Sequence, residues 1–301
     1  IINISVFLVA DYNLIGEGQI CSAVSLSGKQ FRTAGFTDML FELIQGYPSQ
    51  LIAILVGVIF VIISSIGTIL FHIYIRKFLN FESSFNELIG ITLDGFLALY
   101  GILLGLLAVG AYENLNNMND IVSKEASNIS VIYRDFRGYP EPIRGELNKQ
   151  LRSYASEIVT NSWPRQAKHI MPTGEAKYID KLYDILVSFK PEDKAQEIIH
   201  AQTLDQFNKL MESRRGRIDN LDSKIPDILW WLVMLGAAIT ISLICLLNYG
   251  LKSHLIFGGI LSFYVGAMIA VIASMDSPFV GANSIDPQSI QKVIDSPSFH
   301  K

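Results

Sequence analysis

The sequence has 301 residues, of which 50% are hydrophobic and only 17% are charged. Soluble domains carry about 25% charged residues, and here the deficit falls in four long apolar blocks, so the composition excludes an ordinary soluble domain and indicates a membrane protein. The net charge of −4 gives no support for nucleic acid as a partner, and two cysteines, Cys21 and Cys245, do not make a disulfide framework.

Residues 1–50 form an N-terminal segment that carries the weakest pattern in the chain. Ile1–Ala10 is apolar but too short to cross a bilayer. It lacks the basic residues with which a signal peptide begins, so the pattern favours a signal peptide only weakly. Thr37–Gln45 has the pattern of an amphipathic helix at a membrane surface. We therefore expect this segment to be interfacial.

Four blocks that follow are long enough to span a membrane as helices, which takes about 20 apolar residues. Each is too long for a strand, and together they contain a single charged residue, Asp94. The blocks are Leu51–Ile75, Leu88–Tyr112, Ile228–Leu251 and Leu255–Met275.

The spans pair into two hairpins, residues 51–112 and 227–275, followed by a tail over residues 276–301. The connection at 252–254 is so short that the last two spans must be antiparallel neighbours. Cytoplasmic segments near span ends carry an excess of Lys and Arg. Eight such residues lie on the side of the termini and only three (Arg76, Lys77 and Lys252) on the side of the hairpin turns, so we expect the termini and residues 113–226 to be cytoplasmic, and the protein to be multi-pass in the cell membrane.

Residues 113–226 are polar and have a helical pattern. Glu113–Arg137 continues from the second span without a breaker, and Gly138-Tyr139-Pro140 ends it. Three more helices are expected: Glu141–Ser162 (closed by Trp163-Pro164), Glu175–Phe189, and Glu192 to about Ser223. The expected fold is an all-α membrane protein with a helical cytoplasmic domain inserted between spans 2 and 3.

No catalytic, cofactor or metal signature occurs. The five histidines do not pair at ligand spacing, and HExxH, CxxC, Walker A, GxGxxG and GxSxG patterns are absent. The oxygen-rich cluster Glu113, Asn114, Asn117 and Asp120 suits a cation, but it equally suits the polar first turn of a cytoplasmic helix, which we favour. We therefore expect a non-enzymatic protein without catalytic residues, cofactor or bound metal.

The second span carries the most informative pattern. At 100° per residue, a stripe of mostly small residues lies on one face of this helix, and Asp94 belongs to it. The stripe consists of Asp94, Ala98, Gly101, Gly105, Ala108 and Tyr112. Small residues let helices approach closely, but they also line narrow pathways. A carboxylate within a span normally faces water or a bundle interior, and rings of carboxylates select cations. The alternative is that Asp94 is simply hydrated near the outer interface; both interpretations stay open.

The fourth span repeats small residues every four positions. Such a face is typical of close helix–helix packing within or between subunits. The helix-packing residues we expect are Gly258, Ser262, Gly266 and Ala270.

Several short runs, taken in order, resemble the bestrophin-like family, once known as a domain of unknown function. They cover roughly residues 51–295: Gly105–Glu113, Lys124–Asn128 with its Glu-Ala pair, Tyr133-Arg134, Arg152-Ser-Tyr154, Asn161–Pro164 and Met275–Gly281. The resemblance implies four spans with a cytoplasmic helical domain. Bestrophins proper are pentameric ion channels whose pore is lined by the second span and continued by the cytoplasmic helices.

Carried over, the resemblance makes the stripe from Asp94 to Tyr112 the candidate pore face and Glu113 a candidate at its cytoplasmic entrance. The implied partners are the lipid bilayer, further copies of the chain (a pentamer) and inorganic ions. The run of bulky apolar residues found in a bestrophin neck is absent from this face. Two hypotheses follow: an oligomeric ion channel, which places the stripe on a shared axis, or a non-conducting scaffold or sensor whose cytoplasmic domain binds a partner, which buries the stripe within one subunit.

Overall fold

The computed structural model describes residues 48–75, 83–168, 170–248, 250–281, 284–297 and 299. These residues form helices and connecting turns, and no strand occurs among them. The expectations for Ile1–Ala10 and Thr37–Gln45 fall outside the described residues.

Four helices are long and apolar enough to cross a membrane, in the order expected from the hydropathy. The first is α3 (Ser49–Leu70), which continues into a π-helical turn, η1 (Phe71–Ile75). The others are α4 (Ser83–Asp135), α9 (Asp227–Leu246) and α10 (Leu251–Met275). The described part of the chain is therefore mostly helical with four candidate membrane spans.

The connection between the last two spans lies earlier in the chain than the sequence predicts. α9 ends at Leu246 because Leu247 adopts an extended backbone (φ −64°, ψ 131°), and α10 begins after Gly250. Lys252 and His254 therefore lie inside the first turn of α10, and the predicted turn at 252–254 is wrong. Hydropathy misses this break because no charged residue occurs between Ile228 and Leu251, whereas the backbone leaves the helix at Leu247.

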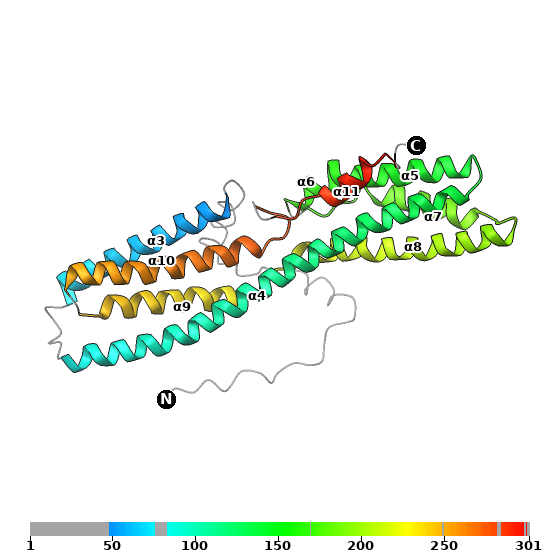
Figure 1. Cartoon of the computed structure of the whole chain (residues 1–301). Coiled ribbons are helices and arrows are strands. Elements are labelled where there is room, and N and C mark those ends of the chain that lie inside the picture. Colours follow the sequence, from blue (N-terminus) through cyan, green and yellow to red (C-terminus); the bar gives the residue numbers. More distant parts are fainter. Residues whose placement is uncertain are drawn as a thin grey trace, which may run out of the picture. The chain divides into compact units, whose positions relative to one another are not determined.

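The apolar helices pack around α10, which has its largest contact with α3 and further contacts with α4 and α9 (Figure 1). The α3–α10 contact is close because glycines face it. A Cβ atom added to Gly57 would lie 2.7 Å from the ring of Phe263, and one added to Gly266 would lie 2.8 Å from the ring of Phe60. A larger residue at either position would push the two helices apart.

Helix α4 joins the apolar helices to the polar part of the chain. Its 53 residues run without interruption through the boundary at Tyr112–Glu113, as the sequence predicts. Figure 1 shows its first half beside α9 and its second half beside α8. Two hydrogen bonds mark these neighbours: the Tyr100 hydroxyl donates to the Val233 carbonyl at 2.8 Å, and the Asn128 amide donates to the Ser213 hydroxyl at 3.2 Å.

The helical domain, as we call residues 113–226, continues from α4 through a 3-10 turn, η2 (Phe136–Gly138). Its main helices are α5 (Ile143–Glu157), α7 (Ala176–Ser188) and α8 (Lys194–Asp219), and a 3-10 turn, η4 (Asn220–Asp222), leads on toward α9. Asp193 caps α8, because its carboxylate accepts a 2.7 Å hydrogen bond from the Gln196 backbone N–H.

Trp163-Pro164 does not end the helix that starts near Ile143. After α5 the chain makes a π-helical turn, η3 (Ile158–Ser162), and then a short helix, α6 (Trp163–Gln166), with Pro164 in its first turn. A proline is tolerated there because the first N–H groups of a helix have no partner within that helix. The predicted end at Ser162 was therefore four residues early.

The hydrophobic core of the helical domain includes residues from beyond α10. A short helix, α11 (Gln288–Ile294), contacts α4 and α5, and its Ile290 is completely buried. The Trp163 indole N–H donates to the Ile285 carbonyl at 3.2 Å, and its ring meets Phe279 edge-on. Residues 276–301, predicted as a tail, thus contribute side chains to this core.

Candidate functional site

The first half of α4 presents three different faces. One face is buried against the other apolar helices through Ile89, Leu93, Tyr100, Leu104 and Ala111. Tyr100 fixes this contact, since a Cβ atom at Gly236 of α9 would overlap its ring. The two remaining faces have little or no cover from the described part of the chain.

The stripe of small residues forms the second face. Asp94, Ala98, Gly101, Tyr112 and Glu113 are exposed, and Gly105 and Ala108 are half-buried. A Cβ atom added to Gly101 or Gly105 would meet no atom within 4 Å among the described residues. Packing within one subunit therefore does not explain why these residues are small. Among the described residues, no helix packs over Gly101 or Gly105, whereas the scaffold hypothesis expects the stripe to be buried within one subunit.

Bulky aliphatic residues make up the third face, beside the stripe. Four of them are between 55% and 71% exposed: Leu99, Ile102, Leu106 and Val109. They belong to a different face because they lie about 60–140° around the helix from the stripe centre. The exposed side of α4 thus divides into a small-residue half that carries Asp94 and a bulky apolar half.

The small-residue face of α10 has a different environment. Gly258, Ser262, Gly266 and Ala270 are all buried. A Cβ atom at Gly258 would lie 2.9 Å from Ile244 of α9, and one at Gly266 would meet Phe60 of α3. The two stripes, similar in sequence, therefore have different surroundings: the glycines of α10 pack against α3 and α9, whereas Gly101 and Gly105 of α4 meet no neighbour among the described residues.

The cluster after Tyr112 does not converge on a cation. Asn114 turns toward the α8–α9 connection, where its amide donates to the Ser223 carbonyl at 2.9 Å and its oxygen accepts from the Ser223 hydroxyl at 3.1 Å. Glu113, Asn117 and Asp120 are exposed. Within the described ranges no three His, Cys, Asp or Glu side chains come together as metal ligands.

A buried ion network crosses the helical domain, and sequence reasoning missed it. Arg217 of α8 is fully buried and contacts two buried carboxylates: Glu125 of α4 at 2.6 Å and 3.1 Å, and Glu175, which precedes α7, at 2.8 Å. Arg214 adds a 3.1 Å contact to Glu175, and the Tyr154 hydroxyl of α5 donates to Glu125 at 2.5 Å. The network thereby joins four segments of the domain: α4, α5, the residue before α7, and α8.

The electrostatics of this network favour charged Arg217 and charged Glu175. Burial disfavours both charges, but the neighbouring carboxylates outweigh it and raise the pKa of Arg217 well above its usual range. Burial likewise works to raise the pKa of Glu175, and Arg217 and its hydrogen bonds bring the net result below the usual value. Burial, reinforced by Glu125, raises the pKa of Tyr154, which therefore stays a neutral donor.

A signal for the network was present in the sequence. Glu125 lies four residues before Ile129 and seven after Met118, so it occupies the apolar stripe of its amphipathic helix. A charge at such a position needs a buried partner. Its partner could not be identified because Arg217 lies 92 residues further along the chain.

Asp276, at the C-terminal end of α10, ties the two last spans to the helical domain. Its side chain is 2% exposed and accepts hydrogen bonds from the Ile225 backbone N–H at 2.6 Å and from the Trp230 indole N–H at 3.0 Å. The run Met275–Gly281 therefore has a structural role, since Asp276 anchors the start of α9 and Phe279 packs on Trp163.

Comparison with known proteins gives one family and one fold. The profile of the Bestrophin-like domain family matches residues 58–290. A solved mutant of a bacterial bestrophin homologue from Klebsiella pneumoniae is 12% identical, with a TM-score of 0.60 over 83% of this chain and 99% of that one. A second structure of a homologue from the same organism is 13% identical, with a TM-score of 0.58 over 80% and 95% of the two chains.

A comparison with curated proteins gives no match. At such low identity the solved structures show a shared fold, whereas the family match spans well over half of the chain. The chain belongs to the bestrophin-like family.

Proposed function

We propose that this protein is an oligomeric ion channel whose pathway is lined by the small-residue stripe of α4. The observation that carries the proposal is the exposure of that stripe in a single subunit: a Cβ atom added to Gly101 or Gly105 would meet no atom of the described residues within 4 Å. Small residues exposed in a row beside Asp94 suit a shared, hydrated axis better than a lipid face. Membership of the bestrophin-like family supports the same function.

Asp94 would form a ring of carboxylates near the outer mouth of the pathway. Such a ring concentrates cations and disfavours anions, so the channel is cation-preferring in this proposal. At the other end of the stripe, Tyr112 and Glu113 are exposed where the apolar part of α4 gives way to the helical domain. Both would face the cytoplasmic entrance.

The assembly is a homo-oligomer, a pentamer by analogy with bestrophins. In this arrangement the two hairpins place both termini and the helical domain in the cytoplasm of a cell-membrane protein. The excess of Lys and Arg on that side of the spans supports this orientation.

Two measurements test the proposal. The mass of the detergent-purified protein gives the number of subunits, and a monomer would contradict a shared pathway. Planar-bilayer recordings in a salt gradient then give the reversal potential, which should shift toward the anion value, or the cation conductance should fall, in Asp94→Asn. Leu103→Met, on the opposite side of α4, is the control and should leave selectivity unchanged. Equal reversal potentials for wild type and Asp94→Asn would remove Asp94 as the selecting residue.

A further inference from the structure

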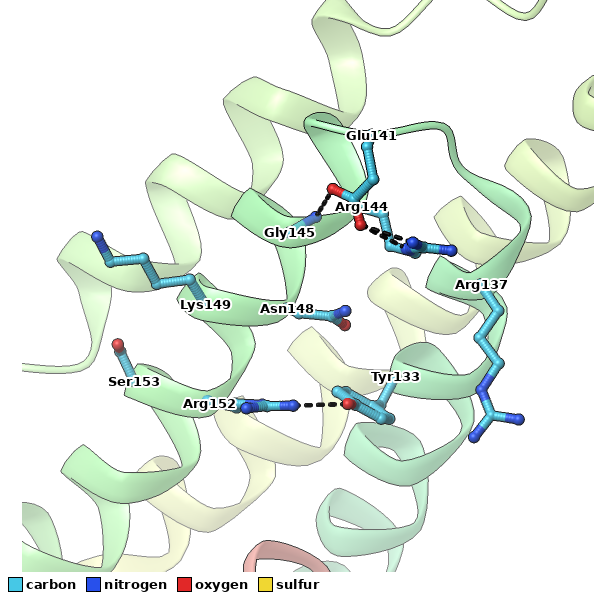
Figure 2. A pocket seen from close by; sticks show the side chains of 9 residues that line it. All are labelled: Tyr133, Arg137, Glu141, Arg144, Gly145, Asn148, Lys149, Arg152 and Ser153. Carbon is cyan, nitrogen blue, oxygen red and sulfur yellow. Dashed lines mark hydrogen bonds and ion pairs between the residues drawn. The ribbon is translucent and has the colours of Figure 1, made fainter. Parts of the chain in front are cut away.

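The end of α4 and the start of α5 enclose a basic cavity that the channel proposal does not use. It has a volume of about 820 Å³ and is open to solvent. Four of its lining residues are cationic and one is acidic, so the lining has a formal charge of +3: Arg137, Arg144, Lys149 and Arg152 against Glu141. Figure 2 shows the guanidinium of Arg152 and the amide of Asn148 projecting from α5 toward α4.

Most of this positive charge is not neutralised by the protein itself. Glu141 pairs with Arg144, with N–O distances of 2.7 Å and 2.8 Å. Among the described residues, neither Arg137 nor Lys149 has a carboxylate partner, and Arg152 donates to a neutral group, the Tyr133 hydroxyl, at 2.7 Å. Like charges around one cavity repel one another, so an anion bound among them would relieve the repulsion.

Among the residues that line the cavity, one buried donor lacks a partner in the described part of the chain: the Nε atom of Arg152. The Oδ1 atom of Asn148 also lacks one, but it is an acceptor and does not attract an anion. Buried polar atoms are nearly always hydrogen-bonded in folded proteins, and an unmade bond costs about 1–3 kcal/mol. Arg152 is already positioned, because its guanidinium stacks 5.5 Å from the ring centre of Tyr133 and 5.8 Å from that of Phe299. The cavity is therefore lined by an arginine whose guanidinium is already held in position.

The chemistry of the lining identifies the class of ligand. Arginine side chains bind phosphate through paired, directional hydrogen bonds, and here three of them come from two different segments. The cations are spread around a cavity of about 820 Å³, so a ligand with several linked phosphates would contact more of them than a single phosphate would. The lining is polar, unlike the mostly apolar pockets that hold drug-like molecules.

The distance between the cavity and the apolar part of α4 decides between a soluble ligand and a membrane lipid. Tyr133 lies 21 residues beyond Tyr112, where the apolar part of α4 ends. At 1.5 Å per residue along one continuous helix, this places the cavity about 30 Å from the apolar segment. A lipid headgroup at the bilayer surface would not reach it.

We propose that this cavity binds a small, soluble anion with several linked phosphate groups. Such a ligand would bridge η2 and α5, so it would stabilise the helical domain at the end remote from the spans. The site is independent of the pore proposal, since none of its residues lies on the α4 stripe.

Calorimetric titration of the full-length protein in detergent at low ionic strength tests the site. The probes are tripolyphosphate, pyrophosphate and orthophosphate, with citrate as a carboxylate comparison. We expect affinity to fall in that order of phosphates, with citrate weaker than pyrophosphate. Tripolyphosphate that does not bind, or citrate that binds more tightly than pyrophosphate, would overturn the assignment.

A pair of matched variants separates a defined site from general attraction to positive charge. Arg137→Gln/Lys149→Gln removes two exposed lining cations, so the fold should keep its melting temperature while tripolyphosphate affinity falls roughly tenfold or more. Arg215→Gln/Lys252→Gln removes the same charge from exposed positions elsewhere and should change affinity less than about twofold. Equal losses in both variants would contradict a defined site.

A final comparison distinguishes the two sources of phosphate. The titration is repeated in nanodiscs of neutral lipid, with and without phosphatidylinositol bisphosphate. Unchanged tripolyphosphate affinity supports a soluble ligand. Competition by the lipid would overturn that assignment.

Discussion

Replacing Arg217 by methionine should destabilise the helical domain more than any other single charge removal in it. The side chain is completely buried and neutralises both Glu125 and Glu175. Methionine fills a similar volume, so the main effect is to leave Glu125 buried without a cation and Glu175 with the 3.1 Å contact to Arg214 alone. Breaking a buried pair by removing one partner costs about 3–5 kcal/mol. For a domain of this size that corresponds to a fall in melting temperature of roughly 6–20 °C.

The assay is thermal unfolding of the detergent-purified protein, followed by tryptophan fluorescence. Arg215→Met is the matched control, because Arg215 is two residues away on α8 and exposed; its effect should stay within about 0.5 kcal/mol. Adding Glu125→Gln and Glu175→Gln to Arg217→Met should restore part of the loss, since neutral groups cost less to bury than unpaired charges. A melting temperature for Arg217→Met equal to that of Arg215→Met would refute the reasoning, and so would a triple variant weaker than the single one.

Three further outcomes can be checked. Because the pKa of Glu175 is held below its usual value in the folded protein, its contribution to stability is present above the unfolded pKa and is lost as the pH falls through the folded one; melting temperatures measured between pH 7 and pH 3 should show this loss, and Glu175→Gln should flatten the curve. Gly266→Leu should reduce the melting temperature or abolish the oligomer, because Phe60 occupies the space that the new side chain needs; an unchanged oligomer and melting temperature would remove the packing role. In a background without the native cysteines, Ile170→Cys and Lys252→Cys should react oppositely with an impermeant thiol reagent on intact cells, with labelling only at 252; labelling at 170 would reverse the proposed orientation.

The sequence alone determined the membrane spans and the continuous helix. Hydropathy found α3, α4, α9 and α10, because the bilayer thickness imposes a length that apolar composition reveals directly. The absence of a breaker between Tyr112 and Glu113 predicted correctly that α4 continues into the helical domain. These features are local, so they can be read from neighbouring residues.

The ends of the helices were harder to predict from the sequence. Pro164 read as a stop, yet the chain re-enters a helix there through a π-helical turn. The hydropathy did not reveal that α9 ends at Leu246, where the backbone of the next residue becomes extended. Both depend on backbone angles that the surrounding packing selects.

Only the tertiary structure decided which of two similar stripes is covered. Gly266 of α10 and Gly105 of α4 occupy comparable patterns, but within the described ranges Gly266 packs against Phe60 and Gly105 meets no neighbouring helix. Likewise, the contact between Glu125 and Arg217 and the cavity between Tyr133 and Arg152 bring together residues that are separated along the chain. Periodicity fixes which face of a helix a residue occupies, whereas the partner of that face depends on how distant helices pack, and that is a property of the folded chain as a whole.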